Sequence, residues 1–183
     1  MTSRQTPWPR AWLMTDERIG DRLWGAIERL PQGESGIVFR HYSLSPAERA
    51  RIGLKIVQIC RSRAIVLAVA SDEDLAAELD AELVHNPRRP PVALPFSKSV
   101  HSMKEALAAR EEGAALVFIS PVYPTASHPG QPGLGARRAI EFARAANVPA
   151  IALGGVTKEK FAPLERGGFH GWAGVDAWDK ASN

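Results

Sequence analysis

The chain has 183 residues, 45% of them hydrophobic and 23% charged, which is ordinary for a soluble globular protein and excludes a largely disordered chain. The net charge is +3, but the 23 basic residues are scattered without a stripe or an aromatic-interleaved patch, so nucleic-acid binding is not indicated. A single cysteine excludes an internal disulfide, and no apolar run reaches the length of a signal-peptide core or a membrane span. We therefore expect one cytoplasmic domain over residues 1–183, with residues 1–10 flexible and with neither nucleic-acid nor membrane partners.

In chain order, short apolar runs alternate with segments in which apolar residues recur at helical spacing. The runs predict strands at residues 12–16, 36–40, 64–70, 81–85, 92–97, 114–119, 150–153 and 171–175. The amphipathic segments predict helices at residues 18–30, 45–61, 71–79, 102–113, 134–146 and 158–166. Strand and helix thus alternate along most of the chain.

Polar residues of the right type precede several of these helices. Ser45 with Glu48, and Ser102 with Glu105, match the capping box, in which the first side chain and the one three residues later each accept a backbone N–H. Ser71 is expected to cap the short acidic helix after the third strand. These residues fix where the predicted helices begin.

Eight predicted strands, separated mostly by helices, favour a closed parallel (β/α)8 TIM barrel of the α/β class over an open sheet. The link over residues 86–91 leaves no room for a fourth helix, and little chain remains after residue 176 for an eighth. We expect a small barrel in which these two helices are reduced or missing. The carboxyl ends of the strands would meet at one face, where ligands bind in such folds.

Gly154 and Gly155 follow a buried strand and precede a helix that Thr157 can cap. Without Cβ atoms, both glycines can adopt positive φ and let a ligand approach their amides, and a helix N-terminus favours an anion. The turn is a candidate phosphate-binding site, and we expect Gly155→Asp to abolish binding while leaving the fold largely intact. A tight turn without a ligand is the alternative, and the pattern alone favours it.

Four segments in order carry a resemblance to a known family: WLMTD at residues 12–16, SVHSMKE at 99–105, SPVYPTAS at 120–127 and PAIALGG at 149–155. With these segments the chain resembles the thiamine phosphate synthase family, which includes related thiazole tautomerases. The resemblance implies a (β/α)8 barrel that joins an aminopyrimidine diphosphate to a thiazole phosphate and releases diphosphate, with magnesium present. The implied partner is a phosphorylated small molecule, which is thiazole phosphate, pyrimidine diphosphate or thiamine phosphate, and a homodimer is left open.

The resemblance also implies roles for individual residues. The implied catalytic residues are Arg40, Asp72, Ser99 and His101. The implied substrate- or phosphate-binding residues are Thr125, Ser127, Gly154, Gly155, Gly174 and Val175. Asp72 is the one match to a family magnesium carboxylate, and its alternative interpretation is an acid in the first turn of a helix, where the helix dipole favours it.

Other positions depart from the family pattern. Residues 86–90 contain no second magnesium carboxylate, His128 stands where a lysine is usual, and Asp176 places a negative charge near the implied phosphate site. Pro121 stands where thiazole tautomerases have a catalytic histidine. Each lost cation or metal ligand would cost about 3 kcal/mol of transition-state stabilisation. The sequence therefore leaves open a synthase, a non-catalytic or regulatory binder of a phosphorylated ligand, and a different reaction on a related heterocycle.

The segment of residues 121–135, between the sixth strand and the next helix, is rich in proline and glycine. Such segments rarely pack as regular structure, and loops at this face of a barrel often carry function. We predict a mobile lid that becomes ordered when ligand binds.

Overall fold

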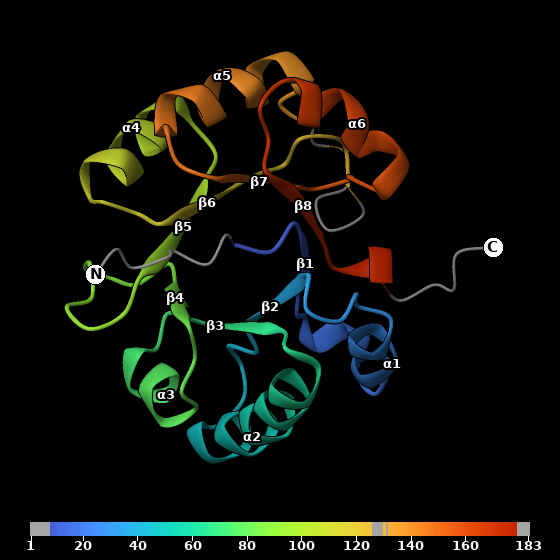
Figure 1. Ribbon diagram of the computed structural model, residues 1–183, viewed down its shortest axis with the longest axis vertical. Coiled ribbons are helices and arrows are strands. Elements are labelled where there is room, and N and C mark those ends of the chain that lie inside the picture. Colours follow the sequence, from blue (N-terminus) through green and yellow to red (C-terminus); the bar gives the residue numbers. More distant parts are fainter. Residues whose placement is uncertain (1–7, 126–129, 131, 179–183) are drawn as a thin grey trace.

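A computed structural model describes residues 8–125, 130 and 132–178 of the chain. Its strands form one closed, parallel barrel in the order β1 to β8 (Figure 1), and Ala11 of β1 lies opposite Trp172 of β8 where the barrel closes. The strands are β1 Ala11–Met14, β2 Ser35–Phe39, β3 Val66–Ala70, β4 Leu83–His85, β5 Phe96–Val100, β6 Leu116–Ile119, β7 Ala150–Leu153 and β8 Gly171–Gly174. The predicted (β/α)8 barrel is confirmed.

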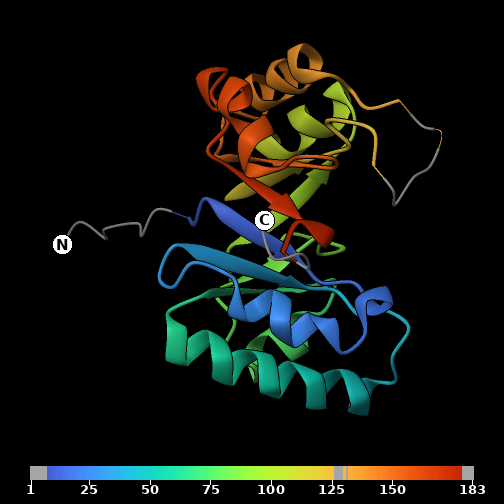
Figure 2. The same cartoon turned by 90° about the vertical axis from the view of Figure 1, so that its right-hand side faces the viewer.

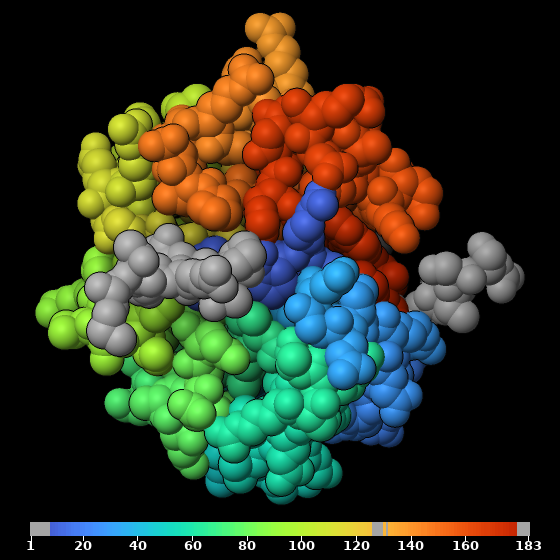
Figure 3. Space-filling view, viewed as in Figure 1, coloured from blue at the N-terminus to red at the C-terminus, as the bar shows by residue number. Residues whose placement is uncertain are grey.

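Helices surround the barrel, and the space-filling view shows them packed as a ring about its axis (Figures 1 and 3). They are α1 Arg22–Glu28, α2 Pro46–Arg63, α3 Glu73–Glu78, α4 Met103–Glu111, α5 Ala136–Ala146 and α6 Lys158–Arg166, with the 3-10 turns η1 Glu17–Ile19 and η2 Asp176–Trp178. Over the described ranges, no helix joins β4 to β5, and only η2 follows β8, as expected for the fourth and eighth helices. None of the described helices combines the length and apolar character needed to cross a bilayer.

Several predicted boundaries shift by one or two residues, and two predicted elements differ more. The helix expected at residues 18–30 is divided into η1 and α1 by Gly20, whose φ is +51°. The strand expected at residues 92–97 begins only at Phe96 and continues to Val100. The polar residues Ser97, Lys98 and Ser99 belong to this strand and pair with β6 inside the sheet.

The start of α3 also differs from the prediction. Ser71 has a left-handed φ of +59°, and the helix is capped by Asp72, whose Oδ1 accepts the Leu75 N–H at 3.0 Å. Of the two predicted capping boxes, that of Ser45 is complete. Ser102 caps α4 as predicted, but the Glu105 carboxylate accepts the N–H of His101.

A hydrophobic cluster fills the barrel interior. The Trp12 ring meets Phe118 edge-on at a centroid distance of 5.4 Å, and a Cβ on Gly36 would lie 2.5 Å from the Trp12 ring. A second cluster lies between the strands and the helices. Trp12 and Gly36 lie in the amino-terminal halves of β1 and β2, so the barrel interior is filled there.

Figure 2 shows the barrel from the side. The strand arrows point to the right of this view, and the segment that leaves β6 projects on the same side. This is the carboxyl face of the barrel. Residues 1–7 and part of the predicted lid lie outside the described residues, so the expected flexibility of these segments stays a prediction.

Candidate active site

A cavity of about 930 Å³ opens at the carboxyl face, a volume typical of small-molecule sites. The predicted site residues that line it are Arg40, Ser99, His101, Thr125, Gly154, Gly155, Gly174 and Val175. Asp72 is not among the lining residues, and Ser127 lies outside the described part of the chain. The fold therefore brings together residues from five of the strand ends that the sequence singled out.

The Gly154–Gly155 turn has the backbone conformation that the sequence predicts, with φ of +91° and +62°. Neither Gly155 N–H nor Val156 N–H donates a hydrogen bond to another described residue. Thr157 caps α6 by accepting the N–H of Lys160. The turn thus offers to the cavity, at a helix N-terminus, two amides without an acceptor among the described residues, a favourable arrangement for an anion.

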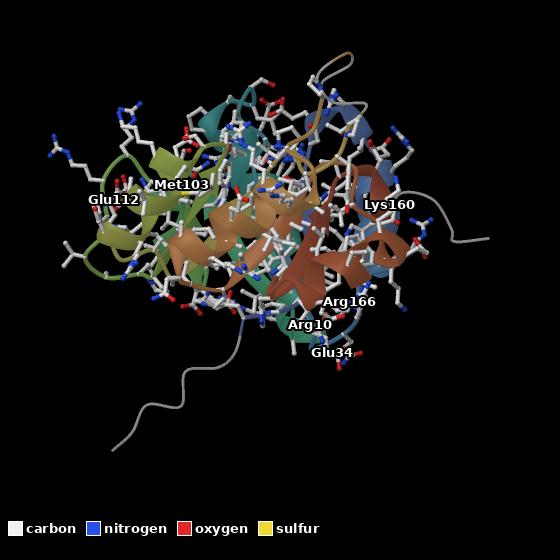
Figure 4. The ribbon with its side chains drawn as sticks, turned by 90° about the horizontal axis from the view of Figure 1, so that it is seen from above. Arg10, Glu34, Met103, Glu112, Lys160 and Arg166 are labelled. Atoms are coloured by element: carbon white, nitrogen blue, oxygen red, sulfur yellow. The ribbon has the colours of Figure 1, made fainter. Side chains whose placement is uncertain are left out.

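Lys160 adds a positive charge to this turn. Its Nζ lies 3.5 Å from the Gly155 carbonyl oxygen and 5.9 Å from the centre of the Tyr123 ring, and its side chain lines the cavity. Figure 4 shows it at the opposite end of α6 from Arg166. Lys160 was not predicted as a site residue, although its position in the first turn of the helix after Gly155 was visible in the sequence.

The glycines also allow the chain after β6 to pack closely against the turn. A Cβ on Gly155 would lie 2.5 Å from the Pro124 carbonyl oxygen, and Tyr123 N–H donates to the Gly154 carbonyl at 3.0 Å. The expectation that Gly155→Asp leaves the fold largely intact is therefore wrong at this point, because Pro124 would have to move. A cleaner test of the turn has to use a side chain such as Lys160.

A charged cluster made of Asp16, Arg18 and Arg40 lines another part of the cavity. Both Asp16 oxygens accept hydrogen bonds from Arg18 at 2.8 Å, and Oδ2 also accepts one from Arg40 Nη2 at 3.1 Å. The Arg18 hydrogen bonds lower the pKa of Asp16 to about 2, so its carboxylate is charged at neutral pH. Arg40 Nε donates to the Thr15 carbonyl at 2.7 Å, which holds the guanidinium in place. The cluster carries a net positive charge.

Asp72 is committed to other partners. While Oδ1 caps α3, Oδ2 accepts a hydrogen bond from Arg49 Nη1 at 2.7 Å, and Arg49 is largely buried and also donates to the Ala70 carbonyl. Magnesium needs carboxylate oxygens free to coordinate it. Nor do the described residues contain a group of three or more histidine, cysteine or acidic side chains placed to hold a metal ion. These residues do not fit the magnesium site that the resemblance implies.

His101 lies at the rim of the cavity and is exposed. Its Nδ1 is 2.8 Å from the Ser120 carbonyl oxygen, which can only accept, so Nδ1 carries a proton. In the neutral ring Nε2 is then an acceptor. His101 is thus held at the junction of β5 and β6 and can contact a ligand.

A buried histidine that the sequence placed only at a strand end lies at the cavity floor. His85 is 1% exposed, with Nδ1 2.9 Å from Ser97 Oγ and Nε2 3.2 Å from Ser99 Oγ. Burial lowers the pKa of His85 to about 3, so the ring is neutral near pH 7. Phe96 and Val100 of β5 pack outward against the helices, and Ser97 and Ser99 point to the opposite face of the strand. This alternation with a period of two could have predicted that the two serines face the barrel interior.

The fold and the site together define a parallel (β/α)8 barrel with a polar, net cationic cavity at the carboxyl face, the place of the active site in barrel enzymes. The chain belongs to the thiamine monophosphate synthase family, whose sequence profile matches residues 12–178. This membership supports a role in thiamine biosynthesis.

Individual proteins of this family are similar to the chain over most of its length. A thiamine-phosphate synthase of Chlorobium luteolum is 30% identical over 180 residues, covering 90% of this chain and 85% of that protein. One from Methanoregula boonei is 29% identical, covering 91% of this chain and 83% of that protein. The solved structure of thiamine phosphate pyrophosphorylase from Pyrococcus furiosus superposes with a TM-score of 0.80 at 25% identity, covering 94% of this chain and 88% of that one.

Proposed function

We propose that this protein joins an aminopyrimidine diphosphate to a thiazole phosphate and releases diphosphate. The observation that carries the proposal is that one cavity holds two separate anion-attracting regions, the Gly154–Gly155 turn with Lys160 and the cluster of Asp16, Arg18 and Arg40. A reaction between two phosphorylated substrates requires two such regions.

The Gly154–Gly155 turn is the proposed site of the thiazole phosphate. The N–H groups of Gly155 and Val156, which have no acceptor in the described part of the chain, suit phosphate oxygens, and the Lys160 ammonium supplies a compensating charge. The nearby turn at Gly174 and Val175 faces the same cavity, but the exposed carboxylate of Asp176 follows it directly. We therefore assign the phosphate to the Gly154 side of the cavity.

The Arg40 side is the proposed site of the diphosphate. Negative charge develops on the diphosphate as its bond to the pyrimidine methylene breaks, so a fixed cation beside it lowers the barrier. Arg40 is fixed by Asp16 and by the Thr15 carbonyl, and Ser99 of β5 offers a hydroxyl to the same cavity. Because Asp72 does not fit a magnesium site, no step of the proposal relies on metal coordination by the protein.

A second candidate is a non-catalytic binder of a phosphorylated thiamine-related ligand in the cytoplasm. The Arg49–Asp72 ion pair favours it, because the matched magnesium carboxylate is used to hold α2 to the start of α3. Such a protein would keep the Gly154–Gly155 turn and lack turnover.

Calorimetric titration with thiazole phosphate and with the unphosphorylated thiazole alcohol tests the site that both candidates share. We expect the phosphate to bind at least about tenfold more tightly, as a charge-assisted hydrogen bond contributes roughly 1.5–3 kcal/mol. Equal affinity for the two compounds would refute both candidates. Formation of thiamine phosphate then separates them.

A further inference from the structure

The His85 ring is held between two serine hydroxyls from the neighbouring strand. Nδ1 faces Ser97 Oγ, Nε2 faces Ser99 Oγ, and the ring meets Phe118 edge-on at 5.1 Å. A neutral imidazole has one N–H and one acceptor nitrogen, so it must donate to one serine and accept from the other. Which serine accepts the N–H of His85 determines whether the Ser99 hydroxyl can donate a hydrogen bond into the cavity.

The burial of Ser97 settles the direction. Ser97 has no exposed surface, and Nδ1 of His85 is the one partner of its hydroxyl among the residues that the structure describes. If Nδ1 carried the proton, the Ser97 hydroxyl proton would be buried without an acceptor, which is unfavourable. If Nε2 carries it, Ser97 donates to Nδ1, Nε2–H donates to Ser99, and the buried Ser97 proton has an acceptor.

Asn86 limits Ser99 from the other side. The Ser99 N–H donates to Asn86 Oδ1 at 2.7 Å, which fixes the orientation of the amide and leaves Asn86 Nδ2 to donate to Ser99 Oγ at 2.9 Å. A hydroxyl oxygen has two lone pairs. With Nε2–H of His85 and the Asn86 amide both donating to it, Ser99 Oγ has no remaining acceptor capacity.

We propose that His85 is a positioning residue, held by Ser97 as the Nε2–H tautomer, and that it makes the Ser99 hydroxyl an obligate donor into the cavity. The ligand atom that faces Ser99 must then be an acceptor, and within the proposed function, on which this assignment rests, that atom is a diphosphate oxygen. The same arrangement disfavours an amine or hydroxyl donor of the ligand at this point.

The low pKa of His85 agrees with this chain of hydrogen bonds from Ser97 through His85 to Ser99. A charged ring would donate from both nitrogens and leave the Ser97 hydroxyl without its acceptor. Ser99 lines the cavity while Ser97 does not. Ser97 therefore acts on the ligand only through His85. Because Ser97 does not line the cavity, a change in ligand affinity on its substitution tests the role of His85.

The tautomer can be measured without any ligand. Long-range ¹H–¹⁵N NMR of the whole protein labelled at histidine nitrogens should show Nε2 of His85 protonated and Nδ1 unprotonated at neutral pH. A protonated Nδ1 would overturn the proposal. In Ser97→Ala both tautomers leave one nitrogen unpaired, so we expect the Nδ1–H form to become populated.

The functional consequence is measured with pyrophosphate as the calorimetric probe. Ser97→Ala should weaken binding about three- to tenfold, the effect of losing a neutral hydrogen bond to the ligand, and Ser99→Ala should weaken it at least as much. Ser35→Ala is the matched control, since Ser35 is equally buried and loses one hydrogen bond, to the Pro31 carbonyl, at the start of β2. This variant should bind like the wild type.

Unchanged pyrophosphate affinity in Ser97→Ala, with an Nε2–H tautomer in the wild type, would refute the positioning role. A wild type that binds no pyrophosphate would contradict the proposed function and the donor role of Ser99. The NMR result would still decide whether His85 is held as the Nε2–H tautomer, so the two failures can be told apart.

Discussion

The carboxylate of Asp72 lies 2.7 Å from Arg49 Nη1 and at the same time caps α3, so its two oxygens join helix α2 to the start of α3. The Asp72→Ala variant should lose about 2 kcal/mol of unfolding free energy, because both the cap and the partner of a largely buried cation disappear. Asp72→Asn should lose about half of that, because asparagine caps equally well. Urea denaturation of the three proteins measures these differences.

We also expect Asp72→Asn to leave magnesium binding unchanged, since the wild type should bind the ion weakly in the absence of diphosphate. Titration calorimetry with magnesium chloride checks this. Tight binding by the wild type that Asp72→Asn removes, with stability unaffected, would show that Asp72 is a metal ligand after all.

Lys160 should contribute directly to phosphate affinity. Replacing it with alanine removes the cation beside the Gly155 turn, and thiazole phosphate should bind about tenfold more weakly. Lys158→Ala is the control, because Lys158 lies in the same helical turn but does not line the cavity. Equal losses in the two variants would indicate a general charge effect and contradict a specific contact.

Asp176 should oppose anion binding. Its exposed carboxylate lines the cavity beside Gly174, and Asp176→Asn should strengthen thiazole phosphate binding about two- to fivefold at low ionic strength, with a smaller gain in high salt. Asp74→Asn, at an exposed position on α3 away from the cavity, should change nothing. Weaker binding in Asp176→Asn would mean that the carboxylate contacts the ligand favourably.

His85 predicts how stability depends on pH. Its folded pKa of about 3 lies below the unfolded value near 6.5, so the unfolded chain takes up the proton first as the pH falls. Between about pH 6 and pH 4 this costs up to about 1.4 kcal/mol per pH unit. Burial lowers the pKa of His41 as well, so His41 contributes in the same direction. The slope of unfolding free energy against pH should be smaller in His85→Gln, and an unchanged slope would contradict a buried neutral His85.

Much of the fold could be predicted because it depends on local patterns. The alternation of apolar runs and amphipathic segments indicated the eight strands of the barrel, and Ser45 and Thr157 marked helix starts correctly. The consecutive glycines at 154 and 155 likewise indicated a turn with positive φ. Each of these features is determined by neighbouring residues.

The errors in the prediction arise where residues distant in sequence determine the local structure or the role of a side chain. Ser71 and Asp72 are both good capping residues, and Arg49, distant in sequence, pairs with the one that caps α3. The role of His85 depends on the register that places it beside Ser97 across two strands. No local sequence pattern determines which strands lie side by side or in which register. The sequence therefore predicted that the site lies at the carboxyl face of the barrel, but not the hydrogen bonds between its side chains.

The most direct test of the account is to incubate the pure protein with the aminopyrimidine diphosphate and the thiazole phosphate, with and without added magnesium, and to measure thiamine phosphate and diphosphate. We predict that both products form in equal amounts and that Arg40→Met abolishes most of the turnover while Asp72→Asn retains it. Binding of both precursors at the cavity with no product under either condition would contradict the synthase function and leave the non-catalytic binder as the function of this chain.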